Sequence, residues 1–125
     1  MFHNTNMKHE LALVAEFHRK LGSPVLETPA LISKERSDFR HRLMSEKVAE
    51  YKEGTDKADL ENIAKELVDI LYTTYGSILE HGLQDKIEDL FAEVHRSNMS
   101  KDYNEFKATK GTNYTPPNIQ KILNV

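Results

Sequence analysis

The stretch KADLENIAKELVDILYTTYGSILEHG, residues 57–82, decides the fold of this chain. Its apolar residues recur at intervals of three and four, which is the spacing of one face of an α-helix. We expect the helix to begin at about Asp56 or Asp59 and to run to His81, with Gly82 as its stop. The face predicted to be buried comprises Leu60, Ile63, Leu67, Leu71, Thr74 and Ile78. The rest of the chain is therefore predicted to pack around one long helix.

Two helices are predicted before this one, and no segment alternates convincingly as a strand does. The first covers residues 7–21, and Gly22 and a loop with two prolines follow it. The second begins near Ser33 or Ser37 and ends at Gly54. The inward-facing candidates of the first helix are Leu11, Val14, Phe17 and Leu21.

A fourth helix is predicted from Gln84 or Asp85 to about Ser100, and a polar tail, residues 102–125, follows it. The residues that this helix is expected to bury are Ile87, Leu90, Phe91 and Val94. Four helices with short connections are typical of a bundle, so we predict an all-α, four-helix bundle-like fold in a single domain, residues 1–125. The long third helix and the extended tail suggest that oligomerisation completes part of the core.

Composition limits the classes of function. The chain has 125 residues, a formal net charge of -3 and no cysteine. The charge argues against a nucleic-acid polymer as a partner, and the missing cysteines exclude disulfides, thiolate metal sites and thiol nucleophiles. Because no apolar segment suits a signal peptide or a membrane span, a cytoplasmic protein without a membrane partner is the expectation.

Two carboxylates stand out on the long helix. Glu66 and Asp69 are three residues apart, so their side chains lie one turn apart on the same face. The two carboxylates lie beside the apolar stripe and are therefore drawn partly toward the core. Burying a carboxylate costs free energy unless a cation or a hydrogen-bond donor compensates its charge. A solvated helix face is the plain alternative for this spacing taken alone.

Acidic residues on the preceding helix favour a metal ion as the compensating cation. Its stripe begins apolar, at Phe39 and Leu43, and becomes acidic at Glu46 and Glu50, with Glu53 as a weaker candidate. Two antiparallel helices that each direct carboxylates at their interface would form an oxygen-rich pocket, which suits Mg²⁺ and would also accept Mn²⁺. Ordinary surface salt bridges remain the alternative. A di-iron carboxylate bundle is excluded because no Glu has a His three residues on.

Cationic and aromatic residues that could hold phosphates lie nearer the end of the chain. EVHRSNMSK, residues 93–101, supplies two cations and an amide, and KGTNYTPP, residues 110–117, supplies a lysine before a flexible glycine. The candidates are Arg96, Asn98, Lys101, Lys110 and Tyr114. Cations at a helix C-terminus also suit the helix dipole, and Tyr114 could stack on a base or simply pack the tail.

Four blocks in this order resemble the all-α nucleoside triphosphate pyrophosphohydrolases, the MazG-like superfamily, which includes phosphoribosyl-ATP pyrophosphohydrolase and dimeric dUTPases. The blocks are RLMSEKVAE (42–50), KELVDILYTTYG (65–76), EVHRSNMSK (93–101) and KGTNYTPP (110–117). The resemblance covers most of the chain. It implies Mg²⁺-dependent hydrolysis of a (d)NTP to (d)NMP and diphosphate, in nucleotide metabolism, by a homodimer or homotetramer. Phosphoribosyl-ATP is the main alternative substrate.

The family pattern, EExxE on one helix and ExxD on the next, carries over to Glu46, Glu50, Glu66 and Asp69 as metal ligands. Glu46 or Glu50 would then take a proton from the attacking water. Lys47 falls on the second acidic position, which is a departure from the pattern. An ammonium there cannot ligate a metal, so it would neutralise phosphate charge or leave a site with fewer metals.

The resemblance also implies that Asn98 and Lys101 contact metal-bound or phosphate oxygens, and that Lys110 and Tyr114 lie near the substrate. Arg96 would help to stabilise phosphate charge, and the tail, residues 102–125, would pack near the site. The rival hypothesis is a non-catalytic helical module that binds a nucleotide through a degraded metal site.

Overall fold

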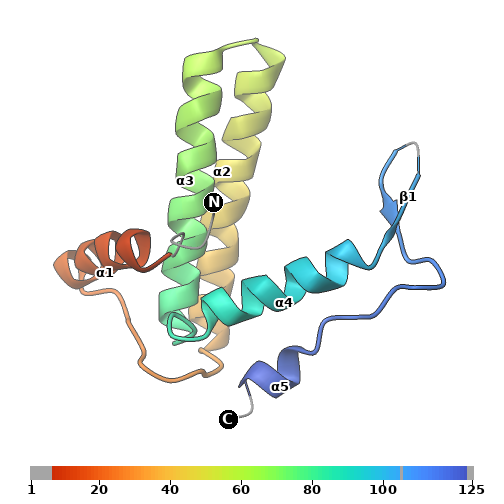
Figure 1. Cartoon of the computed structure of the whole chain (residues 1–125). Coiled ribbons are helices and arrows are strands. Elements are labelled where there is room, and N and C mark those ends of the chain that lie inside the picture. Colours follow the sequence, from red (N-terminus) through yellow and green to blue (C-terminus); the bar gives the residue numbers. More distant parts are fainter. Residues whose placement is uncertain (1–6, 105, 124–125) are drawn as a thin grey trace. The chain divides into compact units, whose positions relative to one another are not determined.

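The computed structural model describes residues 7–104 and 106–123. The elements are α1 (Lys8–Leu21), α2 (Lys34–Asp56), α3 (Leu60–Glu80), α4 (Ile87–Met99), the strands β1 (Asp102–Tyr103) and β2 (Ala108–Thr109), and α5 (Ile119–Leu123) (Figure 1). The all-α prediction is confirmed. The antiparallel hairpin of β1 and β2 and the short α5 were not predicted, because two-residue strands and a five-residue helix have too few residues to show a period.

The chain divides into two compact units, one ending at Gln84 and the other beginning at Asp85. The first contains α1, α2 and α3, and the second contains α4, the hairpin and α5. Among the described residues, no helix combines the length and the apolar character that crossing a bilayer requires.

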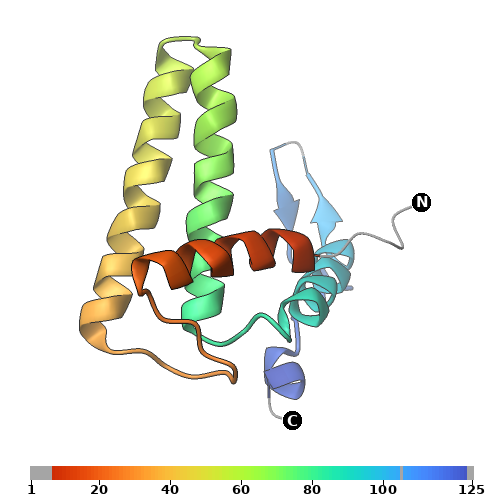
Figure 2. The same ribbon diagram turned by 90° about the vertical axis from the view of Figure 1, so that its left-hand side faces the viewer.

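In the first unit, α2 and α3 lie side by side as an antiparallel pair, and α1 crosses them near the start of α2 and the end of α3 (Figures 1 and 2). The cap residues explain where the pair begins. The Ser33 hydroxyl accepts a hydrogen bond from the backbone N–H of Arg36 at 3.1 Å, and Asp59 accepts one from Asn62 at 3.2 Å. Ser33 and Asp59 are therefore the helix starts, rather than the alternatives Ser37 and Asp56.

The second helix does not end at Gly54, as predicted, but continues to Asp56. Gly54 is buried against α3, and a Cβ added there would lie 3.4 Å from Cγ1 of Ile63. This glycine therefore marks a close approach of two helices rather than a helix end, and helix interiors tolerate glycine at a modest cost.

The predicted inward faces are only partly buried. In α1, Leu11 and Val14 are buried, whereas Phe17 and Leu21 are exposed because they line an open groove. Of the predicted stripe of α3, Ile63 and Ile78 are partly buried in the single chain, while Leu60, Leu67, Leu71 and Thr74 are exposed. In α4, Leu90 is buried and Ile87 partly so, but Phe91 and Val94 are exposed. Several of these apolar side chains therefore remain open to solvent within their own unit.

A buried group of charges joins the three helices of the first unit. We call His18, Arg36, Arg40 and Glu80 the Glu80 cluster. The Glu80 side chain is 0% exposed and accepts hydrogen bonds from Arg36 Nε at 3.0 Å and Nη2 at 2.6 Å. Nη1 of Arg40 lies 3.2 Å from Oε2 of Glu80, and Nδ1 of His18 lies 3.9 Å from the same oxygen. The cluster therefore satisfies its one carboxylate several times over.

Arg40 is held from a second side as well. It donates to the carbonyl oxygen of Thr73 at 2.7 Å and to the Ser77 hydroxyl at 3.1 Å. Gly76 leaves the room for its guanidinium, since a Cβ there would overlap Nη2 of Arg40 and lie 2.8 Å from Nε2 of His18. Burial lowers the pKa of Arg40, and the Glu80 charge opposes that shift.

In the second unit, the tail folds back along α4. Arg96 donates to Glu93, to the Thr115 hydroxyl at 2.7 Å and to the Pro116 carbonyl at 3.1 Å. The backbone N–H of Asn118 donates to Oε2 of Glu93 at 2.7 Å. The Glu93–Arg96 pair thus connects one turn of α4 to the segment before α5.

Candidate metal centre and adjoining groove

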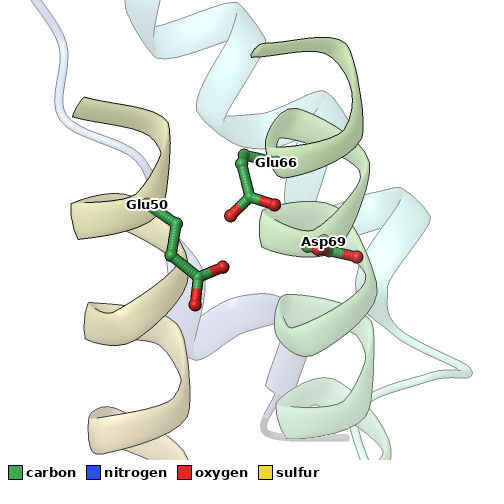
Figure 3. Close-up of side chains that lie close together, drawn as sticks. All are labelled: Glu50, Glu66 and Asp69. Atoms are coloured by element: carbon green, nitrogen blue, oxygen red, sulfur yellow. The ribbon is translucent and has the colours of Figure 1, made fainter. Parts of the chain in front are cut away.

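Three carboxylates converge between α2 and α3. Glu50 comes from α2, Glu66 and Asp69 come from α3, and one oxygen of each lies within 4.8 Å of the others (Figure 3). Because the two helices are antiparallel, the last third of α2 faces the first half of α3, which brings residues far apart in sequence together. We call these three residues the carboxylate cluster. The structure thus places together three of the four predicted metal ligands.

Glu66 is the buried member of this cluster. It is 5% exposed, and its Oε2 has no hydrogen-bond partner among the described residues. A hydrogen bond shared with the Glu50 carboxyl group, together with burial, raises the pKa of Glu66, and the same hydrogen bond lowers the pKa of Glu50. Two facing carboxylates cannot both ionise without a compensating positive charge, so they share either a proton or a cation.

Two lysines neutralise part of the cluster. Nζ of Lys65 lies 2.7 Å from Oδ2 of Asp69 and 3.1 Å from Oε1 of Glu66. Nζ of Lys47 lies 3.5 Å from Oε2 of Glu50 and 3.9 Å from Oδ2 of Asp69. The hydrogen bond from Lys65 lowers the pKa of Asp69 and raises that of Lys65. Neither lysine reaches Oε2 of Glu66, and no other described residue donates a hydrogen bond to it.

The residues present fit a divalent metal. The donors are carboxylate oxygens from two helices, which are the ligands that Mg²⁺ and Mn²⁺ prefer, and the buried Oε2 of Glu66 accepts no hydrogen bond from a described residue and could contact such an ion. Glu46 is exposed, one turn before Glu50, and lies outside the cluster, so its role as a ligand or base stays a prediction. Glu53 lines a cavity of about 220 Å³ with Glu50 and Glu66.

A larger groove of about 560 Å³ lies between α1, α2 and α3. Its apolar lining comprises Phe17, Leu21, Phe39, Leu43 and Tyr72, and its polar lining comprises His18, Ser23, Arg40, Lys47, Asp69 and Thr73. The rings of Phe17 and Tyr72 meet edge to face, with their centroids 5.7 Å apart. Lys47 and Asp69 belong to both the groove and the surroundings of the metal site. The groove and the carboxylate cluster therefore adjoin and share two charged side chains.

Sequence reasoning missed parts of this arrangement. Lys65 was not singled out, although it stands four residues before Asp69, a spacing that brings helical side chains together. Phe17 was assigned to the core, because periodicity identifies an apolar face without showing whether that face meets another element or an open groove.

The other predicted substrate-binding residues belong to the second unit. Arg96 uses its donors on the tail contacts described above, and Asn98 and Lys101 stand at the end of α4, where the Lys101 N–H donates to the Asn98 carbonyl at 3.0 Å. Nζ of Lys110 lies over the ring of Tyr114, 5.3 Å from its centroid. Their roles toward a substrate stay predictions.

Comparison with known proteins adds one finding. Residues 14–98 match the sequence model of the family described as phosphoribosyl-ATP pyrophosphohydrolase. The match covers more than half of the chain, including α2, α3 and all three carboxylates of the cluster, and it ends before the tail. No curated protein matches the chain.

Proposed function

Because the chain belongs to the phosphoribosyl-ATP pyrophosphohydrolase family, we propose that it is a Mg²⁺-dependent hydrolase that splits a (d)NTP into (d)NMP and diphosphate. The observation that carries the proposal is the carboxylate cluster, with one buried oxygen lacking a partner. Phosphoribosyl-ATP is the second candidate substrate, favoured by the family's description. Both substrates offer the same phosphoanhydride bond, so the site chemistry proposed below applies to either.

Glu50, Glu66 and Asp69 would hold the metal, with Glu46 as a further ligand from the next turn of α2. Bound Mg²⁺ supplies Lewis-acid polarisation of phosphoryl oxygens and lowers the pKa of a nearby water. Glu50 is the better placed of the two predicted bases, because it lies within the cluster whereas Glu46 lies outside it. It would accept the proton of the attacking water.

The water oxygen would attack the α-phosphorus, and the bond from that phosphorus to the α–β bridging oxygen would break. The products are the monophosphate and diphosphate, without a covalent enzyme intermediate. Lys47 stands beside the cluster and would offset charge on the phosphates. The aromatic and aliphatic side chains of the groove would hold the nucleoside part.

The second unit would complete the site. We propose that residues 1–125 act as a single domain in which the tail, residues 102–125, closes near the substrate. Arg96, Asn98 and Lys101 would contact phosphate oxygens, and Lys110 and Tyr114 would lie over the substrate. Lys110 and Tyr114 already lie next to each other as a cation–π pair, which would place both near the same part of the substrate.

A second copy of the chain would cover the exposed apolar residues. Leu60, Val68 and Leu71 lie on α3 and are 76%, 60% and 56% exposed. Exposed apolar surface of this kind is costly in water and is typical of an interface between subunits. We therefore propose a homodimer or homotetramer, and sedimentation of the full chain tests its size.

The test of the function is release of diphosphate by the purified full chain from a panel of (d)NTPs and phosphoribosyl-ATP, with Mg²⁺, with Mn²⁺ and with a chelator. We expect metal-dependent turnover of at least one substrate. Asp69→Asn and Glu50→Gln should each reduce kcat by about 10³-fold or more, because each removes a metal ligand.

Glu61→Gln is the matched control, since Glu61 is an exposed acid in the first turn of the same helix and lies outside the cluster. It should retain wild-type turnover. Wild-type rates in both Asp69→Asn and Glu50→Gln would exclude this site. Tight nucleotide binding without turnover of any substrate would favour the non-catalytic module instead.

A further inference from the structure

The two lysines beside the carboxylate cluster are not equivalent. Lys65 is on the same helix as its partners, its side chain is 65% exposed, and its shortest contact to the cluster is 2.7 Å. Lys47 is on α2, its side chain is 28% exposed, and it reaches across to Asp69 on α3 at 3.9 Å. Only Lys47 of the pair also lines the 560 Å³ groove. Lys47 therefore stands between the cluster and the space beside it.

The contacts of Lys47 are also the weaker ones. Its 3.5 and 3.9 Å separations from Glu50 and Asp69 are longer than a charge-assisted hydrogen bond, which is about 2.8 Å. A lysine side chain has a flexible four-carbon stem, so its ammonium moves at little cost. A divalent ion bound to the same carboxylates would repel this ammonium over a distance of a few ångströms.

We propose that Lys47 is an internal counterion which a divalent metal displaces from Glu50 and Asp69 toward the groove, where its ammonium binds the phosphates of the substrate. The inference rests on the proposed function and deepens it. The cluster without metal keeps Lys47 engaged, and the metal releases it. Binding of the metal and binding of a polyphosphate are then coupled, and each ligand increases the affinity for the other through Lys47.

A buried oxygen of the cluster supports a metal position that is distinct from the lysine contacts. Oε2 of Glu66 is buried and accepts no hydrogen bond from the residues that the structure describes, and neither lysine reaches it. A metal would therefore bind at an oxygen that neither ammonium group contacts. The metal and the lysines would compete to neutralise the negative charge of the cluster, but only the metal would contact this oxygen.

The test compares Lys47→Met, Lys65→Met and Lys52→Met in the full chain. Mn²⁺ binding is measured by titration calorimetry without nucleotide, and binding of adenosine 5′-(α,β-methylene)triphosphate is then measured with Mn²⁺ present. Lys52 is the matched control, because it lies on α2 and pairs with Asp56 away from the cluster. Circular dichroism checks that each variant is folded.

Both Lys47→Met and Lys65→Met should tighten Mn²⁺ binding about three- to tenfold, because each removes a positive charge close to the metal. Only Lys47→Met should also weaken binding of the nucleotide analogue, by about tenfold. Lys47→Arg should restore most of that affinity, and Lys52→Met should alter neither value.

The inference is overturned if Lys47→Met leaves Mn²⁺ affinity unchanged or weakens it, or if Lys47→Met and Lys65→Met affect the analogue equally. These outcomes are separate from failure of the proposed function. A wild-type chain that hydrolyses nucleotides but shows no gain of Mn²⁺ affinity in Lys47→Met contradicts the counterion role alone. A wild-type chain that binds no Mn²⁺ contradicts the metal site itself.

Discussion

Acidic and basic side chains meet at two places between α2 and α3, and the two places are built differently. In the Glu80 cluster, one carboxylate receives two arginines and faces a histidine, and its side chain is 0% exposed. In the carboxylate cluster, three carboxylates share two lysines, and Oε2 of Glu66 has no partner. The first has more donors than acceptors, and the second has more acceptors than donors. Buried charge alone does not indicate function, whereas a cluster with more acceptors than donors can bind a cation.

The largest expected loss of stability follows from removing the carboxylate of the Glu80 cluster. Glu80→Gln leaves two arginines with their common anion removed, one of them the buried Arg40. We expect the free energy of unfolding to fall by about 3–5 kcal/mol, the usual cost of an unpaired buried charge. Urea denaturation measures it. Asp38→Asn is the control, because the Lys34–Asp38 pair is exposed, and it should change stability by less than about 1 kcal/mol. Equal effects of the two substitutions would contradict the comparison.

A glycine substitution tests how tightly this cluster is packed. A Cβ in Gly76→Ala would overlap the Arg40 guanidinium, so we expect a loss of about 1–3 kcal/mol from overpacking. Gly54→Ala is the matched control in a helix interior, where the Cβ would meet Ile63 at an ordinary 3.4 Å. That variant should be neutral or gain up to about 1 kcal/mol, since alanine is the better helix former. Thermal unfolding of both variants measures the difference, and a Gly76→Ala variant as stable as Gly54→Ala would show that Arg40 has room to move.

At the carboxylate cluster, neutralising one acid is expected to leave the stability of the metal-free protein unchanged or to raise it slightly. Glu66→Gln removes one of three like charges and supplies an amide donor that can reach the Glu50 carboxylate. In the presence of a chelator, the melting temperature should therefore remain unchanged or rise slightly, in contrast to Glu80→Gln. The increase in melting temperature that Mn²⁺ produces in the wild type should be lost, because a ligand is gone. A marked destabilisation of Glu66→Gln without metal would place Glu66 with Glu80 among the structural charges.

How much of the fold the sequence predicts depends on whether the signal lies within one segment or between segments. Helical periodicity located α1 to α4, since that signal lies within each segment. The exposure of Leu60 and Leu71 in the single chain was not predicted, because an apolar stripe shows which face avoids water but not what covers it. Gly54 was read as a helix stop, because the sequence does not show that another helix approaches there.

The same limit applies to the candidate site: spacing within one segment predicts which side chains are neighbours there, but not which distant segments meet. The three-residue spacing of Glu66 and Asp69 predicted that they share a face, and an antiparallel neighbour then predicted Glu50 opposite them. The Glu80 cluster was not predicted, because its partners stand 44 residues apart, as with Arg36 and Glu80. No local spacing identifies such a pair. Lys47 was noticed only as a departure from a family pattern, and its contact with Asp69 became visible through the pairing of the helices.

A third acidic residue gives the smallest effect and refines the comparison. Glu93 has an arginine partner, as Glu80 does, but in the second unit and at a more exposed position, with the Arg96 side chain 50% exposed. Hydrogen bonds from Arg96, and then from the backbone of Asn118, lower the pKa of Glu93 from 4.5 to about 2. A lowered carboxyl pKa stabilises the folded form above the ordinary value, and that stabilisation is lost as the pH falls toward the lowered value.

We therefore expect the contacts between α4 and the tail to weaken between about pH 4.5 and pH 2, with little change above that range. The Asn118 amide resonance, followed by NMR during an acid titration, reports this directly because that N–H donates to Glu93. Glu93→Gln should lose the transition, whereas Asp89→Asn, on the same helix, should keep it. Since water screens an exposed pair, the effect should be well below that of Glu80→Gln. A transition that persists in Glu93→Gln would show that another acid connects the tail to α4.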